Sequence, residues 1–113
     1  MKVIFNDNVL WDKVKVAGTF GSRFKGLMGK KNLDEGEGLI ISPCNQVHSF
    51  NMNFPIDVIF LTKQMEILKI TTMDPGKVGA VQKHSACVLE VEAGSAEHFG
   101  VANGDTLKID FEV

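Results

Sequence analysis

Short apolar runs, separated by turn signals, constrain the fold of this chain more than any other feature. Strict alternation of apolar and polar residues is typical of a strand with one buried face, and a short unbroken apolar run is typical of a strand covered on both faces. No run approaches membrane-spanning length. The strand-like runs are Lys2–Asn6, Lys13–Ala17, Leu39–Ser42, Val47–Phe54, Ile56–Thr62, Glu66–Thr72, Ala86–Glu92 and Thr106–Val113.

This pattern predicts a mainly β fold. About eight short strands with frequent turn signals are expected in a compact β-sandwich or a small barrel-like domain, with one or two short helices. No linker, repeat or change of composition divides the chain, so we expect one domain over residues 1–113. A doubly wound α/β fold is disfavoured, because the strands do not alternate regularly with long helices.

Two segments carry helical signals. In the segment 19–29 the apolar residues recur at helical spacing, Thr19 is placed to cap the start and Gly29 to close the end. We expect the apolar stripe of this helix to pack against a sheet. A second short helix is expected over Ser95–Phe99. The stripe consists of Phe20, Phe24, Leu27 and Met28.

Alternation also assigns side chains to faces. In the run Val47–Phe54 one face is apolar, with Ser49 on the polar opposite face. Glu90 is expected to point outward from the run Ala86–Glu92. An opening hairpin is expected to join the first two runs around the polar turn at residues 7–8. The apolar face of the run 47–54 consists of His48, Phe50, Met52 and Phe54.

The charge balance gives no sign of a polyanionic partner. The chain has 113 residues, with 12 Lys and Arg against 14 Asp and Glu. Nucleic-acid binding usually needs a basic surface, so we expect no nucleic-acid partner. The start of the chain lacks the apolar stretch of a signal peptide, which predicts a cytoplasmic location. Cys44 and Cys87 are expected to be free thiols there.

Four residues are candidates for a ligand-binding site: Arg23, His48, Met52 and Asp57. Arg23 is either a clamp that gives its guanidinium to carbonyls or a carboxylate, or a fork for an anion. His48 is either a hydrogen-bonded core residue or part of a small-ligand pocket. Asp57 follows a proline at the start of an apolar strand, where a buried carboxylate needs a partner, such as a turn or Arg23.

Two further patterns suggest metal or nucleophile chemistry. Cys44, His48, His84 and Cys87 together have the ligand inventory of a structural zinc site. In a strand, however, His84 and Cys87 project from opposite faces and cannot share an ion. We therefore expect no metal and no cofactor. An enzyme remains an alternative, as a small hydrolase or metal-dependent enzyme that uses His48 with Cys44 or Asp57.

Three motifs occur in order along most of the chain. They are RFKGLM at residues 23–28, HSFNMNFPIDVIFL at 48–61, and VLEVEAG at 88–94 with Gly104-Asp105. This ordered set resembles a widespread prokaryotic family, the domain-of-unknown-function family number 192. The resemblance implies a compact β-sandwich or barrel-like fold and implies no reaction. Many relatives resemble exported proteins, and a bulky aromatic often stands where this chain has Asn51.

These observations favour a small non-enzymatic domain that binds an unknown small ligand or a protein partner. The motivation is that a sole arginine, a histidine and a carboxylate accompany one apolar strand face. The hydrolase described above is one alternative. An accessory or stability factor that acts through a protein partner is another.

Overall fold

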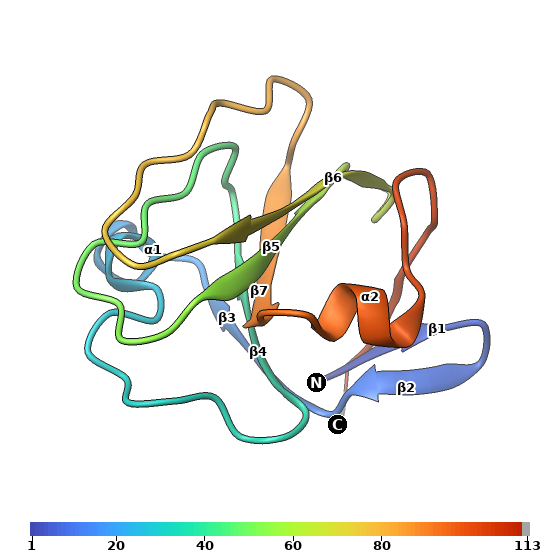
Figure 1. The fold of residues 1–113 in the computed structure, drawn as a ribbon. Coiled ribbons are helices and arrows are strands. Elements are labelled where there is room, and N and C mark those ends of the chain that lie inside the picture. The colour runs from blue at the N-terminus through green and yellow to red at the C-terminus, as the bar shows by residue number, and fades with distance from the viewer. Residues whose placement is uncertain (112–113) are drawn as a thin grey trace.

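The protein, described by a computed structural model over residues 1–111, has eight strands and two short helices (Figure 1). The elements are β1 (Lys2–Phe5), β2 (Asn8–Trp11), β3 (Lys13–Ala17), α1 (Phe20–Lys25), β4 (Glu37–Ile41), β5 (Ile56–Leu61), β6 (Ile67–Met73), β7 (Cys87–Glu92), α2 (Ser95–Phe99) and β8 (Lys108–Asp110).

The strands form two sheets. A three-stranded sheet has the order β2-β1-β8, and a five-stranded sheet has the order β3-β4-β7-β5-β6. Every pairing is antiparallel except that of β3 with β4. The predicted mainly β fold with two short helices is confirmed. No helix within residues 1–111 is long and apolar enough to cross a membrane.

The core lies on both faces of the five-stranded sheet. One cluster fills the space between the two sheets and α2, with Val3, Leu89 and Leu107 among its members. The other cluster covers the opposite face, beneath α1 and the long loops, and includes Leu27 and Val88. Every residue of β5 is buried, as the unbroken apolar run predicts for a strand covered on both sides.

The opening hairpin is shorter than expected. Its turn is at Asn6 and Asp7, which have φ of 50° and 63°, the left-handed region that a tight hairpin turn requires. The hairpin partner of β1 is therefore β2, whereas β3 leaves this sheet and pairs with β4. The last strand ends at Asp110 and Phe111 is exposed, while the predicted extension to Val113 lies outside the described residues.

The prediction of a strand over Val47–Phe54 is wrong. The segment is a loop with a single bridge, between His48 and Val78, and Asn51 has a φ of 58° that interrupts any extended alternation. The faces are also reversed at two positions. Ser49 is completely buried, and Phe50 is 44% exposed.

The helix α1 begins as predicted and ends early. Thr19 caps it through a capping box, in which the Thr19 hydroxyl accepts from the Ser22 backbone N–H at 3.1 Å. The chain leaves the helix at Gly26, with a φ of 47°, rather than at Gly29. α1 therefore has six residues and none is buried, so the expected packing of Phe20 and Phe24 on a sheet is wrong.

Candidate functional site

Two long loops lie side by side at the end of the fold that carries α1 (Figure 1). The loop 42–55 follows β4, and the loop 74–86 follows β6. Backbone hydrogen bonds join them along their length, including Cys44 N–H to Ala86 O at 3.0 Å and Gly79 N–H to Val47 O at 2.9 Å. These bonds give two irregular segments one fixed arrangement, which supports the surface beside α1.

Ser49 fastens the two loops together. Its hydroxyl donates to the Asp74 carbonyl at 2.6 Å and accepts from the Lys77 N–H at 2.8 Å. Its own N–H donates to the Lys77 carbonyl at 2.8 Å. A fully buried hydroxyl is stable only with such partners, which explains why Ser49 points inward despite its polarity.

A groove of about 740 Å³ lies between α1 and these loops, and we call it the α1 groove. Its walls are α1, residues 41–46, His48, Lys63 and residues 85–86. Phe20 and Phe24 are 81% and 59% exposed at its edge. The lining includes two fixed cations, Arg23 and Lys63, and no carboxylate. The groove is thus aromatic on one side and positively charged.

Arg23 is held at this groove by one hydrogen bond within the described residues. Its Nη1 donates to the Pro43 carbonyl at 3.0 Å, which ties α1 to the loop after β4. This is the carbonyl clamp that the sequence suggested. Its Nε is buried without an acceptor. A buried Nε cannot reach a ligand in the groove, so an anion there would bind the other N–H groups of the guanidinium.

His48 lies between two phenylalanines. Its ring centroid is 5.0 Å from that of Phe24 and 5.2 Å from that of Phe50. The Phe50 N–H donates to His48 Nδ1 at 3.2 Å, and His48 Nε2 lies 2.9 Å from the Phe24 carbonyl. These partners assign the proton to Nε2, because Nδ1 must accept. Both ring nitrogens are therefore engaged by backbone groups, and His48 presents an aromatic face.

Cys44 lines the groove without the geometry of an activated nucleophile. Its Sγ donates to the Gln46 carbonyl at 3.2 Å, and no hydrogen bond joins it to His48 within residues 1–111. Burial, the largest influence, raises the pKa of the Cys44 thiol. The reactive thiolate is thereby disfavoured. The described contacts give no support to a Cys44–His48 pair.

Two of the four sequence candidates lie away from the groove. Met52 is buried in the core cluster beneath α1. Asp57 is buried on β5, where one carboxylate oxygen accepts from the Thr72 hydroxyl at 2.7 Å. The other oxygen accepts from the N–H groups of Gly94 and Ala96 at 3.0 Å and 3.1 Å. The structure therefore brings Arg23 and His48 together and uses Asp57 to hold the start of α2.

Glu90 is a buried carboxylate that the sequence pattern assigned to solvent. It is 2% exposed, and its pKa is raised to about 8 by burial. A Cβ on Gly26 would stand 3.4 Å from Glu90 Oε1, so the carboxyl lies beneath the end of α1. No hydrogen-bond partner is present within residues 1–111. Glu90 is thus a buried carboxyl with a strongly raised pKa, and it does not line the α1 groove.

Metal ligation finds no geometric support in the part of the chain that the structure describes. No group of three His, Cys, Asp or Glu side chains within residues 1–111 is arranged to hold an ion. Cys44 and Cys87 are both free. What the site offers instead is an aromatic and cationic groove on a small two-sheet β domain.

Comparison with known proteins identifies the family of this domain. The family model DUF192, described as "Uncharacterized ACR", matches residues 2–109, so the chain belongs to the DUF192 family. The resemblance stated from the three motifs is confirmed.

Relatives and solved structures agree with this assignment. The chain is 32% identical to a UPF0127 protein of Pyrococcus abyssi, over 96% of this chain and 97% of the relative. It is 30% identical to a UPF0127 protein of Thermococcus sibiricus, over 89% of this chain and 67% of the relative. A crystal structure of a protein of unknown function from Novosphingobium aromaticivorans matches with a TM-score of 0.78 and 25% identity. That match covers 85% of this chain and 74% of the other.

Proposed function

We propose that the protein is a non-enzymatic binding domain whose α1 groove docks an apolar, acidic segment of a partner protein. The observation that carries the proposal is the exposure of Phe20 and Phe24, at 81% and 59%, on a helix with no buried residue. Single exposed apolar side chains are ordinary, whereas contiguous aromatic surface on a small domain is typical of an interaction site.

The aromatic surface is continuous. Phe20 and Phe24 are four residues apart on α1 and share a face, and the His48 ring extends the surface from Phe24 to Phe50. Aromatic residues and arginine are the types most enriched where interfaces gain their binding energy. Arg23 lies among these rings, which places a cation inside an aromatic surface.

The charge of the groove specifies the partner further. Arg23 and Lys63 line it with no carboxylate beside them. A partner that carries apolar side chains together with Asp or Glu satisfies both features, and a basic partner is repelled. The contacts of Cys44 and His48 support binding rather than catalysis, because the thiol and both ring nitrogens are engaged with backbone groups.

A peptide library displayed on phage tests this proposal. Selection on the wild-type protein is expected to enrich peptides that combine aromatic or long aliphatic residues with Asp or Glu. The double substitution Phe20→Ala and Phe24→Ala is expected to weaken these peptides by more than about 30-fold, the effect of losing interface anchors. The stability of the double variant should change by less than about 1 kcal/mol, because both side chains are exposed.

Two matched variants make the result specific. Phe111→Ala removes another exposed phenylalanine, 68% exposed and outside the groove, and should leave binding unchanged. Lys63→Gln should weaken acidic peptides, whereas Lys69→Gln, an exposed lysine outside the groove, should not. Equal binding by wild type and the Phe20/Phe24 double variant would refute the proposal.

A further inference from the structure

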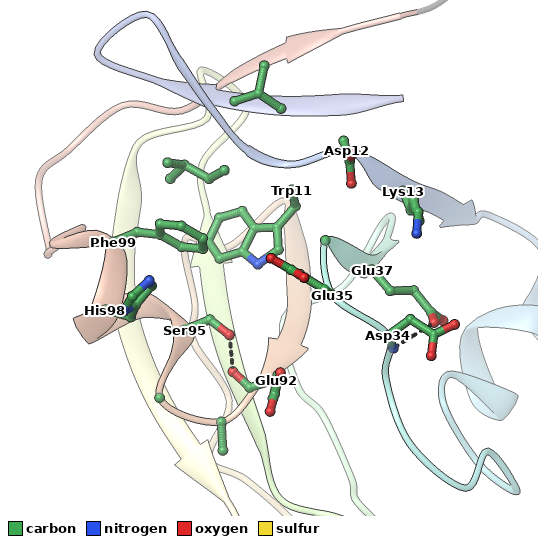
Figure 2. A pocket seen from close by; sticks show the side chains of 15 residues that line it. Trp11, Asp12, Lys13, Asp34, Glu35, Glu37, Glu92, Ser95, His98 and Phe99 are labelled. Atoms are coloured by element: carbon green, nitrogen blue, oxygen red, sulfur yellow. Dashed lines mark hydrogen bonds between the residues drawn. The ribbon is translucent and has the colours of Figure 1, made fainter.

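We propose that a second site, the acidic pocket beside Trp11, binds a basic peptide segment whose main-chain carbonyl accepts a hydrogen bond from the Trp11 indole. The pocket of about 740 Å³ lies between β2, the loop 34–37 and the start of α2 (Figure 2). It shares no lining residue with the α1 groove. The proposal therefore stands independently of the function proposed above.

The pocket has a strong excess of carboxylates. The only lysine or arginine in the lining is Lys13. Glu37 is paired with Lys30, and the other carboxylates have no ion-pair partner within residues 1–111. A concave surface lined by one sign of charge focuses its field and attracts the opposite charge. The lining carboxylates are Asp12, Asp34, Glu35, Glu37 and Glu92.

A second, independent feature is a hydrogen-bond donor in the wall that has no partner among the described residues. Trp11 is 2% exposed, yet its indole N–H has no acceptor within residues 1–111. Figure 2 shows the indole nitrogen on the edge of the ring that faces the pocket. Phe99 holds the ring in place by an edge contact, with centroids 5.2 Å apart and planes at 82°. The indole N–H is thus an open donor in the wall of the pocket, placed to donate to an acceptor on a bound ligand.

In the wall formed by the loop 34–37, the backbone at Gly36 packs closely against Asp12. Gly36 has a φ of 79°, and a Cβ there would stand 2.1 Å from Asp12 Oδ1, so a side chain cannot be accommodated without displacement. The Lys13 N–H donates to the Gly36 carbonyl at 2.9 Å. These contacts fix the loop 34–37 against β2 and β3, which sets the acidic side chains around a preformed pocket.

The carboxylates and the indole N–H of the pocket together indicate which kind of cation fits best. The carboxylates do not converge: no three of the acidic or histidine side chains within residues 1–111 are placed to hold one ion, so a divalent cation is a poor match. A fully protonated polyamine would satisfy the carboxylates and leave the indole N–H without an acceptor. A peptide with lysine side chains supplies both separated positive charges and carbonyl acceptors.

Trp11 is the sole tryptophan of the chain, which makes it a direct reporter. The acetylated, amidated tripeptide Lys-Gly-Lys is titrated into the 113-residue protein while the indole N–H resonance is followed by NMR. We expect a saturable shift of that resonance and a loss of affinity as salt rises, since exposed charges are screened. The neutral tripeptide Gly-Gly-Gly should produce no such shift, and spermidine should bind more weakly than Lys-Gly-Lys.

Substitutions of the lining carboxylates test whether Lys-Gly-Lys binds in this pocket. The double substitution Glu35→Gln and Glu92→Gln should lower the affinity for Lys-Gly-Lys about five- to tenfold. Glu97→Gln makes the same charge change on an exposed residue of α2 outside the pocket and should leave the affinity unchanged. An unmoved indole resonance at saturating peptide overturns the proposal. Equal losses from the Glu35/Glu92 and Glu97 variants, or spermidine binding as tightly as the tripeptide, do so as well.

Discussion

Glu90→Gln is expected to stabilise the protein at alkaline pH and to remove much of the pH dependence of its stability. The Glu90 carboxyl is buried without a partner, and burial raises its pKa from 4.5 to about 8. Between these two values the folded protein keeps the proton that the unfolded chain has lost. The contribution of Glu90 to stability is therefore fully present below about pH 4.5 and is lost as pH rises toward 8. The slope is about 1.4 kcal/mol per pH unit for one such group.

The size of this effect makes it measurable. A loss on the order of 5 kcal/mol across the window is a large part of the stability of a small domain. Glutamine has the shape of the protonated acid and cannot ionise, so Glu90→Gln should unfold at higher urea concentration than wild type at pH 9. The control is Glu92→Gln, an exposed residue of the same strand. Parallel stability curves for wild type and Glu90→Gln from pH 5 to 9 would contradict this account.

Asp57→Ala is expected to destabilise the protein by on the order of 3 kcal/mol. The carboxylate accepts three hydrogen bonds, from Thr72, Gly94 and Ala96, and the Ala96 N–H is buried. Alanine leaves these donors without an acceptor, and bonds to a charged group are the stronger kind. Urea unfolding measures the loss, and amide hydrogen exchange at Ala96 should become faster as the start of α2 loosens.

Milder substitutions separate the contribution of the Thr72 hydroxyl bond from that of the two backbone N–H bonds. Asp57→Asn keeps one acceptor oxygen for the backbone N–H groups and is expected to cost less than alanine. Thr72→Val removes only the hydroxyl bond and should cost about 1 kcal/mol. Peptide binding in the α1 groove should be unchanged in Asp57→Asn, because Asp57 does not line the groove. An Asp57→Ala variant as stable as wild type would show that the carboxylate does not support α2.

Local signals predicted those elements whose structure depends on local interactions. The helix Ser95–Phe99, the Thr19 cap and the buried strand β5 all follow from residue spacing or from side chains within one turn. Alternation failed over Val47–Phe54 because bonds to a distant loop decide that segment. The Ser49 contacts with residues 74–77 and the left-handed Asn51 override the two-residue period.

In the candidate site, too, the sequence predicted some residues, whereas others are brought in only by contacts between distant segments. Arg23 and His48 were identified from the sequence, and the structure places both at one groove. Lys63 and Phe20 join them only through the fold. Glu90 was missed because alternation assigned one face of its strand to solvent, whereas both faces of β7 are covered in the structure. Its position opposite Leu39 and Val58, both apolar, is the signal that strand pairing would have revealed.

The most direct test of the proposed function is a map of NMR shift changes when a selected acidic, apolar peptide is titrated into the protein. We predict that the changes centre on Phe20, Arg23, Phe24 and His48 and disappear in the Phe20/Phe24 double variant. Changes centred on α2 and Trp11, or spread evenly and retained in the double variant, would contradict the assignment of the α1 groove as the binding surface.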